Sequence, residues 1–270
     1  MLGFLYIMKQ QVNFKDKFKR AVTGNFDLSG EDTDRFEAQC GLFGWLTTRL
    51  LNMVPPLPER PILDVGCGTG ISTTTIIDHV RKETRVAGVD ISPVMIDRAQ
   101  GKCLKADFHL GDAELLSEIT TGPFGGVYYT ACIFLFPDVK TSLMQASRIM
   151  ADGGAVAGSY METIQGKDGK DLMALAKETY PHLGIKHKKL FSFEELAETF
   201  DGLFRNVVRE EVRFKMNREI VEAFYSIPAQ SASLFPGEPV HVRLKKVKEV
   251  FQLIDTEEYF SVWNLVGGKK

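Results

Sequence analysis

The sequence predicts an α/β fold in which an open, largely parallel β-sheet carries helices on both faces. Short apolar runs alternate with helical patterns five times between residues 61 and 161. A glycine-rich turn follows the first predicted strand, and Asp90 ends the second. Because parallel strands need long crossover connections, which are usually helices, this alternation favours a sheet covered on both sides.

Local signals justify each element in turn. Strands are predicted at residues 61–65, 85–90, 104–110, 126–134 and 155–161. The helices between them are predicted at residues 71–82, 93–103, 113–120 and 139–150. Ser92 and Pro93 suit the N-cap and first position of the second helix, and the pair Gly153-Gly154 stops the last.

Further helices are expected at both ends of the chain. Residues 26–54 predict a helix with an apolar stripe. The C-terminal elements are helices at 170–180 and 192–200, a strand at 204–214, helical stretches at 218–226 and 239–254, and a strand at 257–268. We therefore expect an N-terminal helical extension over residues 1–58 and a sheet domain over 59–270, with a helical insert at about 215–255.

Composition and charge make several classes of function improbable. A chain of 270 residues that is 44% hydrophobic can bury a large core. Its net charge of -2 gives no general attraction to nucleic acid, so the basic clusters at residues 15–20 and 186–189 are expected to be solvated faces. The four cysteines are far apart in sequence, which predicts neither disulfides nor a metal site and favours a cytoplasmic protein.

The N-terminal stretch MLGFLYIM is apolar but only eight residues long. It is too short to span a bilayer and lacks the cleavage site of a signal peptide, so no integral membrane segment is expected. Translation could begin at Met1 or at Met8.

The stretch ILDVGCGTG, residues 62–70, places Gly66, Gly68 and Gly70 directly after the first strand. Without a Cβ, the chain can turn sharply and bring its amides close to a ligand at a helix N-terminus, where anionic groups are favoured. Ligands of such sheets bind at the carboxyl ends of the strands. The loop therefore predicts a nucleotide-like ligand; the alternative is a tight turn that binds nothing.

Asp90 follows Gly70 by twenty residues, at the tip of the second strand. A carboxylate in this position can accept hydrogen bonds from both ribose hydroxyls. Nicotinamide-dependent oxidoreductases use the same arrangement and are one alternative. The GxGxG spacing disfavours them, because the dinucleotide pattern GxGxxG would require glycine where this chain has Ile71.

Four motifs in this order resemble those of the class I S-adenosylmethionine-dependent methyltransferases, particularly the small-molecule group with the ubiquinone and menaquinone enzymes. ILDVGCGTG is similar to the first motif and VAGVDISPVMIDRA to the second. GDAELL is similar to the GDA loop, and GPFGGVYYTACIFLFPD occupies the place of the fourth strand. The resemblance covers roughly residues 25–162. It implies a Rossmann-like seven-stranded sheet ending in an antiparallel hairpin, an N-terminal helical lid, and S-adenosylmethionine as cofactor.

The resemblance also implies roles for single residues. The cofactor-binding residues that it implies are Asp64, Gly66, Cys67, Gly68, Gly70, Asp90, Ile91, Met95, Asp112, Ala113 and Thr130. Asp64 would orient the ammonium group, and the amides of the glycine loop would border the methionine part. Asp90 would hold the ribose, and Thr130 would lie near the sulfonium.

The adenine would meet residues after the second and third strands. Ile91 and Met95 would flank the ring, and Asp112 with the Ala113 amide would read its edge. Asp112 could instead serve only as a helix N-cap before AELL.

The acceptor side departs from the family pattern. The family commonly has aspartate where this chain has Gly125, and often histidine where it has Phe134. The Asn/Asp-Pro-Pro-Tyr signature of enzymes that methylate exocyclic or amide nitrogens is replaced by YYTACIF. We therefore expect a small, partly apolar acceptor of unspecified identity. A binding protein that holds the cofactor without turnover is a further alternative.

Methyl transfer from a sulfonium depends mainly on positioning and desolvation, so a catalytic base is optional. Glu162, after the fifth strand, is the best-placed candidate base, although it could merely begin the next loop. The apolar segment IPAQSASLFPG, residues 227–237, predicts a loop over the strand ends. With Phe224, Tyr225, Gln230 and Phe235 it would line the acceptor pocket; the alternative is helix packing.

Overall fold

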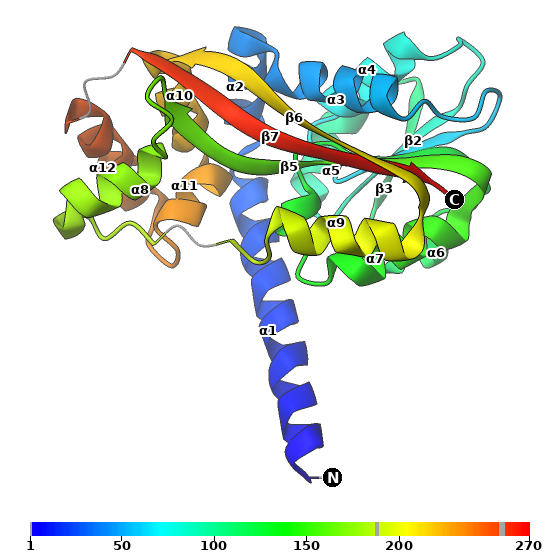
Figure 1. The fold of residues 1–270 in the computed structure, drawn as a ribbon, viewed down its shortest axis with the longest axis horizontal. Coiled ribbons are helices and arrows are strands. Elements are labelled where there is room, and N and C mark those ends of the chain that lie inside the picture. The colour runs from blue at the N-terminus through cyan, green and yellow to red at the C-terminus, as the bar shows by residue number, and fades with distance from the viewer. Residues whose placement is uncertain (1, 187–188, 254–256) are drawn as a thin grey trace.

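The computed structural model describes residues 2–186, 189–253 and 257–270, with the backbone alone described for residues 2–13. Seven strands form one sheet in the order β3-β2-β1-β4-β5-β7-β6 (Figure 1). The strands are β1 (Ile62–Val65), β2 (Val86–Asp90), β3 (Ala106–Leu110), β4 (Phe124–Tyr129), β5 (Met150–Gly166), β6 (Arg205–Asn217) and β7 (Glu258–Lys269). The predicted seven-stranded α/β sheet is confirmed.

The sheet is parallel from β3 to β5 and antiparallel where β7 pairs with β5 and with β6. The closing antiparallel pair matches the hairpin that the resemblance implies. β2 and β3 extend the sheet on one side of β1, whereas β4 and β5 extend it on the other. Ligands of open α/β sheets bind outside the carboxyl ends of the strands at such a switch point.

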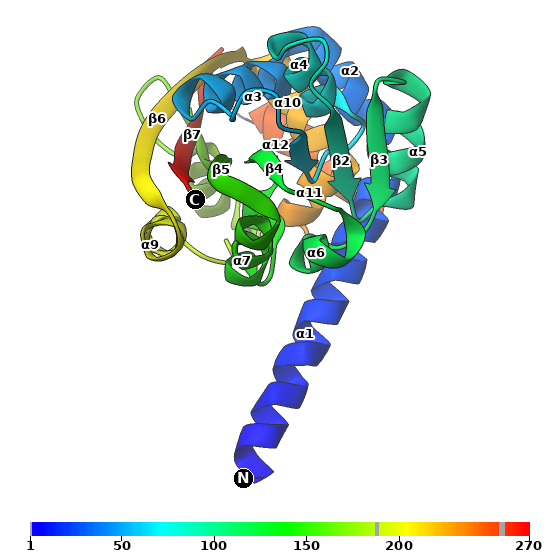
Figure 2. The same cartoon turned by 90° about the vertical axis from the view of Figure 1, so that its right-hand side faces the viewer.

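Helices cover both faces of the sheet (Figure 2). One face carries α2 (Gly30–Cys40), α3 (Leu42–Met53) and α4 (Ile71–His79); the other carries α6 (Leu116–Ile119), α7 (Val139–Ile149) and α9 (Phe193–Leu203). Because side chains alternate along a strand, Ile62 packs in the core beneath α3, whereas Leu63 and Val65 pack in the core beneath α7 and α9. Both faces of β1 are therefore buried.

The remaining elements lie at the edges of these layers. α5 (Pro93–Lys102) packs beside β3, and three short 3-10 helices are η1 (Ala113–Leu115), η2 (Ile133–Leu135) and η3 (Pro181–Leu183). α8 (Leu172–Thr179), α10 (Arg218–Ser226), α11 (Pro228–Leu234) and α12 (Val240–Leu253) gather at one end of the sheet, on the left in Figure 1.

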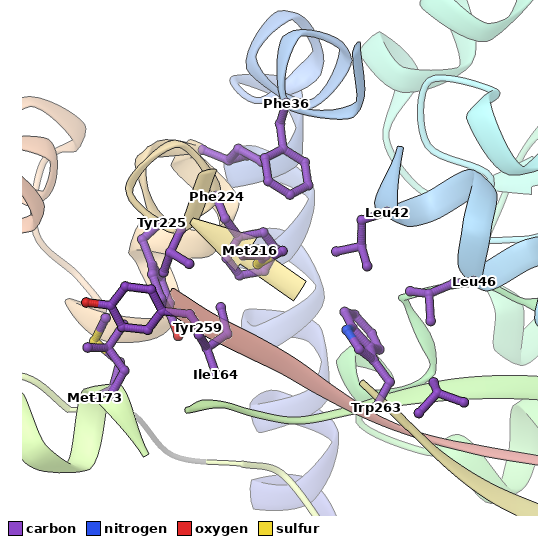
Figure 3. Packing of buried hydrophobic residues seen from close by; sticks show 14 of the residues in the cluster. Phe36, Leu42, Leu46, Ile164, Met173, Met216, Phe224, Tyr225, Tyr259 and Trp263 are labelled. Carbon is purple, nitrogen blue, oxygen red and sulfur yellow. The ribbon is translucent and has the colours of Figure 1, made fainter. Parts of the chain in front are cut away.

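Aromatic packing joins this helical group to the rest of the molecule. Phe224 of α10 lies with its ring centroid 5.4 Å from that of Phe36 in α2 (Figure 3). Both rings, and Trp263 of β7, are no more than 1% exposed. The insert is thus part of the main core.

The first helix, α1 (Leu2–Asp27), lies within the helical extension expected over residues 1–58, although no separate helix was predicted before residue 26. Its C-terminal part lies against the body and its N-terminal part projects away from it (Figures 1 and 2). Across the ranges given above, no helix is both long and apolar enough to cross a membrane.

Several predicted boundaries are wrong, and three of them concern the elements around the site. Residues 26–54 form two helices rather than one, because Gly41 adopts φ 69° and ends α2. The strand predicted at 126–134 ends at Tyr129, since Ala131 has φ 54° and turns the chain out of the sheet. The strand predicted at 155–161 is longer at both ends, as β5 shows.

The fourth correction concerns residues 227–237, which were predicted as a loop. They contain the helix α11, whose first position is Pro228. The proline ring holds φ near the helical value and needs no amide donor at that position, so it begins the helix rather than breaking it.

Candidate cofactor and acceptor sites

The glycine loop leaves β1 at the switch point. Gly66 has φ 68°, and a Cβ on it would lie 2.7 Å from the Cys132 sulfur, so this position excludes a side chain on both counts. The loop amides are partly engaged already: the Gly68 amide donates to Asp90 Oδ2 over 2.8 Å. The loop and the end of β2 are therefore held as one unit.

Asp90 is the centre of that unit. Its Oδ1 accepts from the Ser92 amide at 2.9 Å, and its Oδ2 accepts from Gly68. Burial raises the pKa of this carboxyl, and the backbone donors oppose that rise. Each carboxylate oxygen can accept more than one hydrogen bond, so Asp90 keeps acceptor capacity toward the cavity that it lines.

Asp64 lies behind the glycine loop and is fully buried. Its Oδ2 accepts from the hydroxyls of Ser72 and Thr73, both at 2.6 Å. Among the described residues, Asp64 Oδ1 has no hydrogen-bond partner. Burial raises the pKa of the Asp64 carboxyl to about 6. An unpartnered carboxylate oxygen at the loop fits a ligand with a cationic group, such as the ammonium of S-adenosylmethionine.

A cavity of about 100 Å³ opens beside this loop, at the carboxyl ends of β1, β2 and β4. Of the predicted cofactor residues, it is lined by Gly66, Gly68, Asp90, Ile91, Asp112 and Ala113. The structure therefore brings together the residue assigned to the ribose, those assigned to the adenine except Met95, and part of those assigned to the methionine.

Five predicted residues do not line the cavity. Asp64 lies behind the loop, and Gly70 packs against Ala99 of α5. Cys67 and Met95 are buried, at 3% and 1% exposure, and Thr130 places its hydroxyl oxygen 3.2 Å from that of Thr47 in α3. Met95 and Thr130 therefore support the walls rather than face the cavity.

The roof of the cavity is α1, which contributes Lys19, Val22 and Phe26. Lys19 Nζ lies 2.6 Å from Asp112 Oδ2 and 2.7 Å from Glu114 Oε2. Asp112 Oδ1 meanwhile accepts from the Glu114 amide at 2.9 Å, so Asp112 is also the N-cap of η1. Asp112 thus has the N-cap role considered as its alternative while also lining the cavity.

Further contacts hold α1 in place. Lys15 Nζ lies 2.5 Å from Asp138 Oδ2. At the C-terminal end of α1, Asp27 accepts a hydrogen bond from the Ser92 hydroxyl over 2.6 Å, and Asn25 accepts one from the buried Arg243 over 2.8 Å. The prediction that the basic cluster at residues 15–20 is only a solvated face is wrong for Lys15. It is wrong for Lys19 as well.

The sequence held a signal for this roof. Phe18, Val22 and Phe26 recur every four residues and so share one face of a helix, and Lys15 and Lys19 have the same spacing. That pattern predicts an amphipathic helix with two basic anchors, which a count of charges alone does not reveal.

A second, larger cavity of about 360 Å³ adjoins the first, and we call it the chamber. Both cavities are lined by Val22 and Phe26 of α1 and by Leu135. The chamber walls come mainly from α1, the end of β5, α10 and α11. A ligand in either cavity would therefore touch the same part of α1.

The chamber holds most of the predicted acceptor residues. Phe224, Tyr225, Gln230 and Glu162 line it. Phe235 does not: it is 1% exposed in the core, with Lys246 Nζ 5.1 Å from its ring centroid. The placement predicted for Phe235 is wrong because residues 228–234 form the helix α11, and Phe235, the residue that follows it, is buried in the core instead of facing the chamber.

Glu162 is not a free carboxylate. Its Oε1 lies 2.5 Å from Lys189 Nζ, and its Oε2 accepts from Asn264 Nδ2 at 3.1 Å. Tyr160, the other polar group near this end of β5, donates its hydroxyl to the Phe191 carbonyl at 2.5 Å, and burial raises its pKa. Because both groups are already engaged in the protein, neither is arranged as a general base.

Comparison with known proteins agrees with this geometry. Residues 62–154 match a family model described as a methyltransferase domain. The chain is 26% identical over 144 residues to aklanonic acid methyltransferase DauC of a Streptomyces species, covering 52% of this chain and 64% of that protein. It is 32% identical over 108 residues to trans-aconitate 2-methyltransferase of Methylobacterium radiotolerans, covering 40% of each. The chain thus spans less than two thirds of the length of these relatives.

Solved structures share the fold. The YcgJ protein of Bacillus subtilis superposes with a TM-score of 0.57 at 15% identity, over 84% of this chain and 98% of that one. A phosphoethanolamine N-methyltransferase of Haemonchus contortus, solved with S-adenosylhomocysteine, has a TM-score of 0.51 at 18% identity, over 83% of this chain and 52% of that one. At these identities the similarity establishes the architecture alone.

Proposed function

We propose that this chain, a class I S-adenosylmethionine-dependent methyltransferase, transfers a methyl group from S-adenosylmethionine to a small, partly apolar acceptor. One observation carries the proposal: the cavity beside Asp90 and the glycine loop adjoins a chamber with mainly apolar walls, and the two share Val22, Phe26 and Leu135. A cofactor cavity and an acceptor cavity in contact are what a direct transfer requires.

The residues of the first cavity fit the cofactor part by part. In this proposal Asp90 accepts from the ribose hydroxyls, Ile91 lies against the adenine, and Asp112 meets its edge. The amides at Gly66 and Gly68 border the methionine part, and the unpartnered oxygen of Asp64 attracts the ammonium, directly or through water.

When bound, S-adenosylmethionine supplies an electrophilic methyl group on a sulfonium. In the transfer, a lone pair of the acceptor forms the new bond to carbon while the carbon–sulfur bond breaks and its electrons stay on sulfur. The protein's contribution is to align the acceptor and exclude water. The aromatic walls of the chamber, with Phe224 and Tyr225 among them, serve both purposes.

A general base is not part of this proposal. Glu162 forms an ion pair with Lys189 and accepts a hydrogen bond from Asn264, so its predicted role as a base loses support. The acceptor must then carry a lone pair that is available at neutral pH. Two of the relatives are named for acids, aklanonic acid and trans-aconitate, whose carboxylates meet this condition.

The predicted enzyme class, domain division and location are treated in turn. The relatives support small-molecule methyltransferases in general rather than the quinone group. No finding favours the nicotinamide-dependent oxidoreductase. The division into residues 1–58 and 59–270 is kept as a proposal. A cytoplasmic location is proposed on the same terms, with Cys40, Cys67, Cys103 and Cys132 all unpaired.

Calorimetric titration with S-adenosylmethionine, S-adenosylhomocysteine and NADH tests the cofactor. We expect the two sulfur nucleotides to bind and the Asp90→Ala variant to lose at least tenfold in affinity, since hydrogen bonds to a charged group contribute about 1.5–3 kcal/mol. Binding of NADH alone would overturn the proposal. Cofactor binding without methylation of any compound in a panel of small acids, amines and phenols would favour the non-catalytic binding protein.

A further inference from the structure

Two lysines stand in the wall of the chamber. Lys189 lines it with its side chain 34% exposed, and its Nζ lies 5.2 Å from the ring centroid of Tyr160. Lys186 also lines it, and its amide donates to the Leu234 carbonyl at 2.8 Å, which fixes its backbone beside α11. Two cations thus accompany a mainly apolar cavity.

The carboxylates of the same wall are already engaged. Glu162 is bound by Lys189 and by Asn264. Asp171 is the N-cap of α8: its Oδ1 accepts from the Ala174 amide at 2.5 Å, and its Oδ2 accepts from the Thr163 hydroxyl. Among the described residues, Lys186 has no acidic partner.

The charges of Lys186, Lys189, Glu162 and Asp171 sum to zero, but the two lysines keep hydrogen-bond donors that no carboxylate uses. An ammonium has three donors, and Glu162 Oε1 uses one of those on Lys189, so Lys189 can hold Glu162 and a ligand anion together. Tyr160 supports the ammonium through its ring face. Lys186 is exposed and the Lys189 side chain is 34% exposed, so water partly screens both charges, and the apolar walls of the chamber add the contact with the body of the ligand.

We propose that the chamber selects acceptors with an apolar body and a carboxylate-like anionic group, and that Lys189 and Lys186 bind that group. The inference rests on the proposed function, because it concerns the acceptor of the same reaction. It goes beyond it by assigning the charge of the acceptor and two specificity residues. Both lysines belong to the segment that the sequence predicted to be a solvated basic face.

Octanoate and octanamide are suitable probes, because they have the same number of heavy atoms and differ in charge. Calorimetry on the full chain saturated with S-adenosylhomocysteine should show octanoate binding at least tenfold more tightly than octanamide. Lys189→Met and Lys186→Met should each reduce octanoate affinity severalfold, and the double variant should abolish the preference. Octanamide affinity should not change.

Lys170→Met is the matched control, since Lys170 pairs with Asp168 outside the chamber and should leave octanoate binding intact. Equal binding of the two probes, no octanoate binding at millimolar concentration, or unaltered binding by the double variant would each overturn the inference. Affinity for S-adenosylhomocysteine, titrated separately on every variant, reports on the proposed function. If the wild-type chain does not bind S-adenosylhomocysteine, the proposed function is overturned. If it binds S-adenosylhomocysteine but fails the octanoate test, only the assignment of the acceptor is overturned.

Discussion

Lys19 Nζ lies 2.6 Å from Asp112 Oδ2, so the first helix is tied to the segment that the adenine edge is proposed to meet. The pair joins residues 93 positions apart in sequence. The roof of the cofactor cavity is therefore held by an ion pair at the cavity itself.

Replacing Lys19 by methionine should loosen that roof. We expect S-adenosylhomocysteine to dissociate about fivefold faster, as the loss of a partly exposed ion pair worth about 1 kcal/mol implies. Surface plasmon resonance on immobilised protein measures this rate. Lys17→Met, on the exposed side of the same helix, is the control and should dissociate at the wild-type rate. An unchanged or slower rate for Lys19→Met would contradict the role of the pair.

Asp64 should make stability depend on pH. Burial raises its pKa from 3.8 to about 6, so between these values the folded state binds more protons than the unfolded state. The contribution of this group is fully present below the unfolded value and is lost as pH rises through the folded value. The total loss is on the order of 3 kcal/mol, about half of it above pH 5.

Urea unfolding of the ligand-free protein at several pH values measures this effect. Asp64→Asn should make the decline shallower, because the amide can still accept from Ser72 and Thr73 but carries no charge. A residual decline is expected from Asp90, whose pKa is also raised by burial. Asp107→Asn, at an exposed position on β3, should retain the wild-type decline. Parallel pH profiles for the wild type and Asp64→Asn would refute the assignment.

Two glycine-to-alanine changes should act in opposite directions. Gly70 has φ 85°, and a Cβ there would lie 3.3 Å from the Cα of Ala99, so Gly70→Ala should destabilise the protein by about 1–3 kcal/mol. Gly24 lies within α1 with no atom within 4 Å of an added Cβ, so Gly24→Ala should stabilise it by up to about 1 kcal/mol. Thermal unfolding measures both variants. A Gly70→Ala variant as stable as the wild type would contradict the strain at Gly70, and a destabilised Gly24→Ala variant would contradict the open space at Gly24.

Gln230 and Phe235 should separate acceptor binding from stability. Gln230 lines the chamber, so Gln230→Ala should raise the acceptor KM severalfold without altering thermal stability or cofactor affinity. Phe235 is buried in the core, so Phe235→Ala should cost about 3–5 kcal/mol of stability. Steady-state kinetics and urea unfolding check the pair. A Gln230→Ala variant with wild-type KM would place the acceptor elsewhere.

The sheet could be predicted from the sequence because its signals are local. Each strand from β1 to β5 contains a short, largely apolar run, and Asp90 and the glycine loop mark the ends of two of these strands. The residues of those ends meet in space because parallel strands present their carboxyl ends at one edge. For this reason Asp90 and Asp112 line one cavity.

The contacts that hold the roof and line the chamber could not be predicted in full, because they depend on partners that are distant in sequence. Lys19 appears as part of a basic cluster until Asp112 is placed beside it, and Lys189 meets Glu162 across 27 positions. Residues 227–237 read as a loop because two prolines flank them, although the first of these begins α11. Such features are decided by tertiary packing rather than by local pattern.

Val22 and Phe26 belong to both cavities, and this sharing has a thermodynamic consequence. The first ligand to bind would restrict the motion of α1, so the second would lose less conformational entropy on binding. The cofactor and the acceptor would then show positive cooperativity. By reciprocity, each would tighten the affinity for the other by the same factor. Through α1, each ligand would thus dissociate more slowly when the other is also bound.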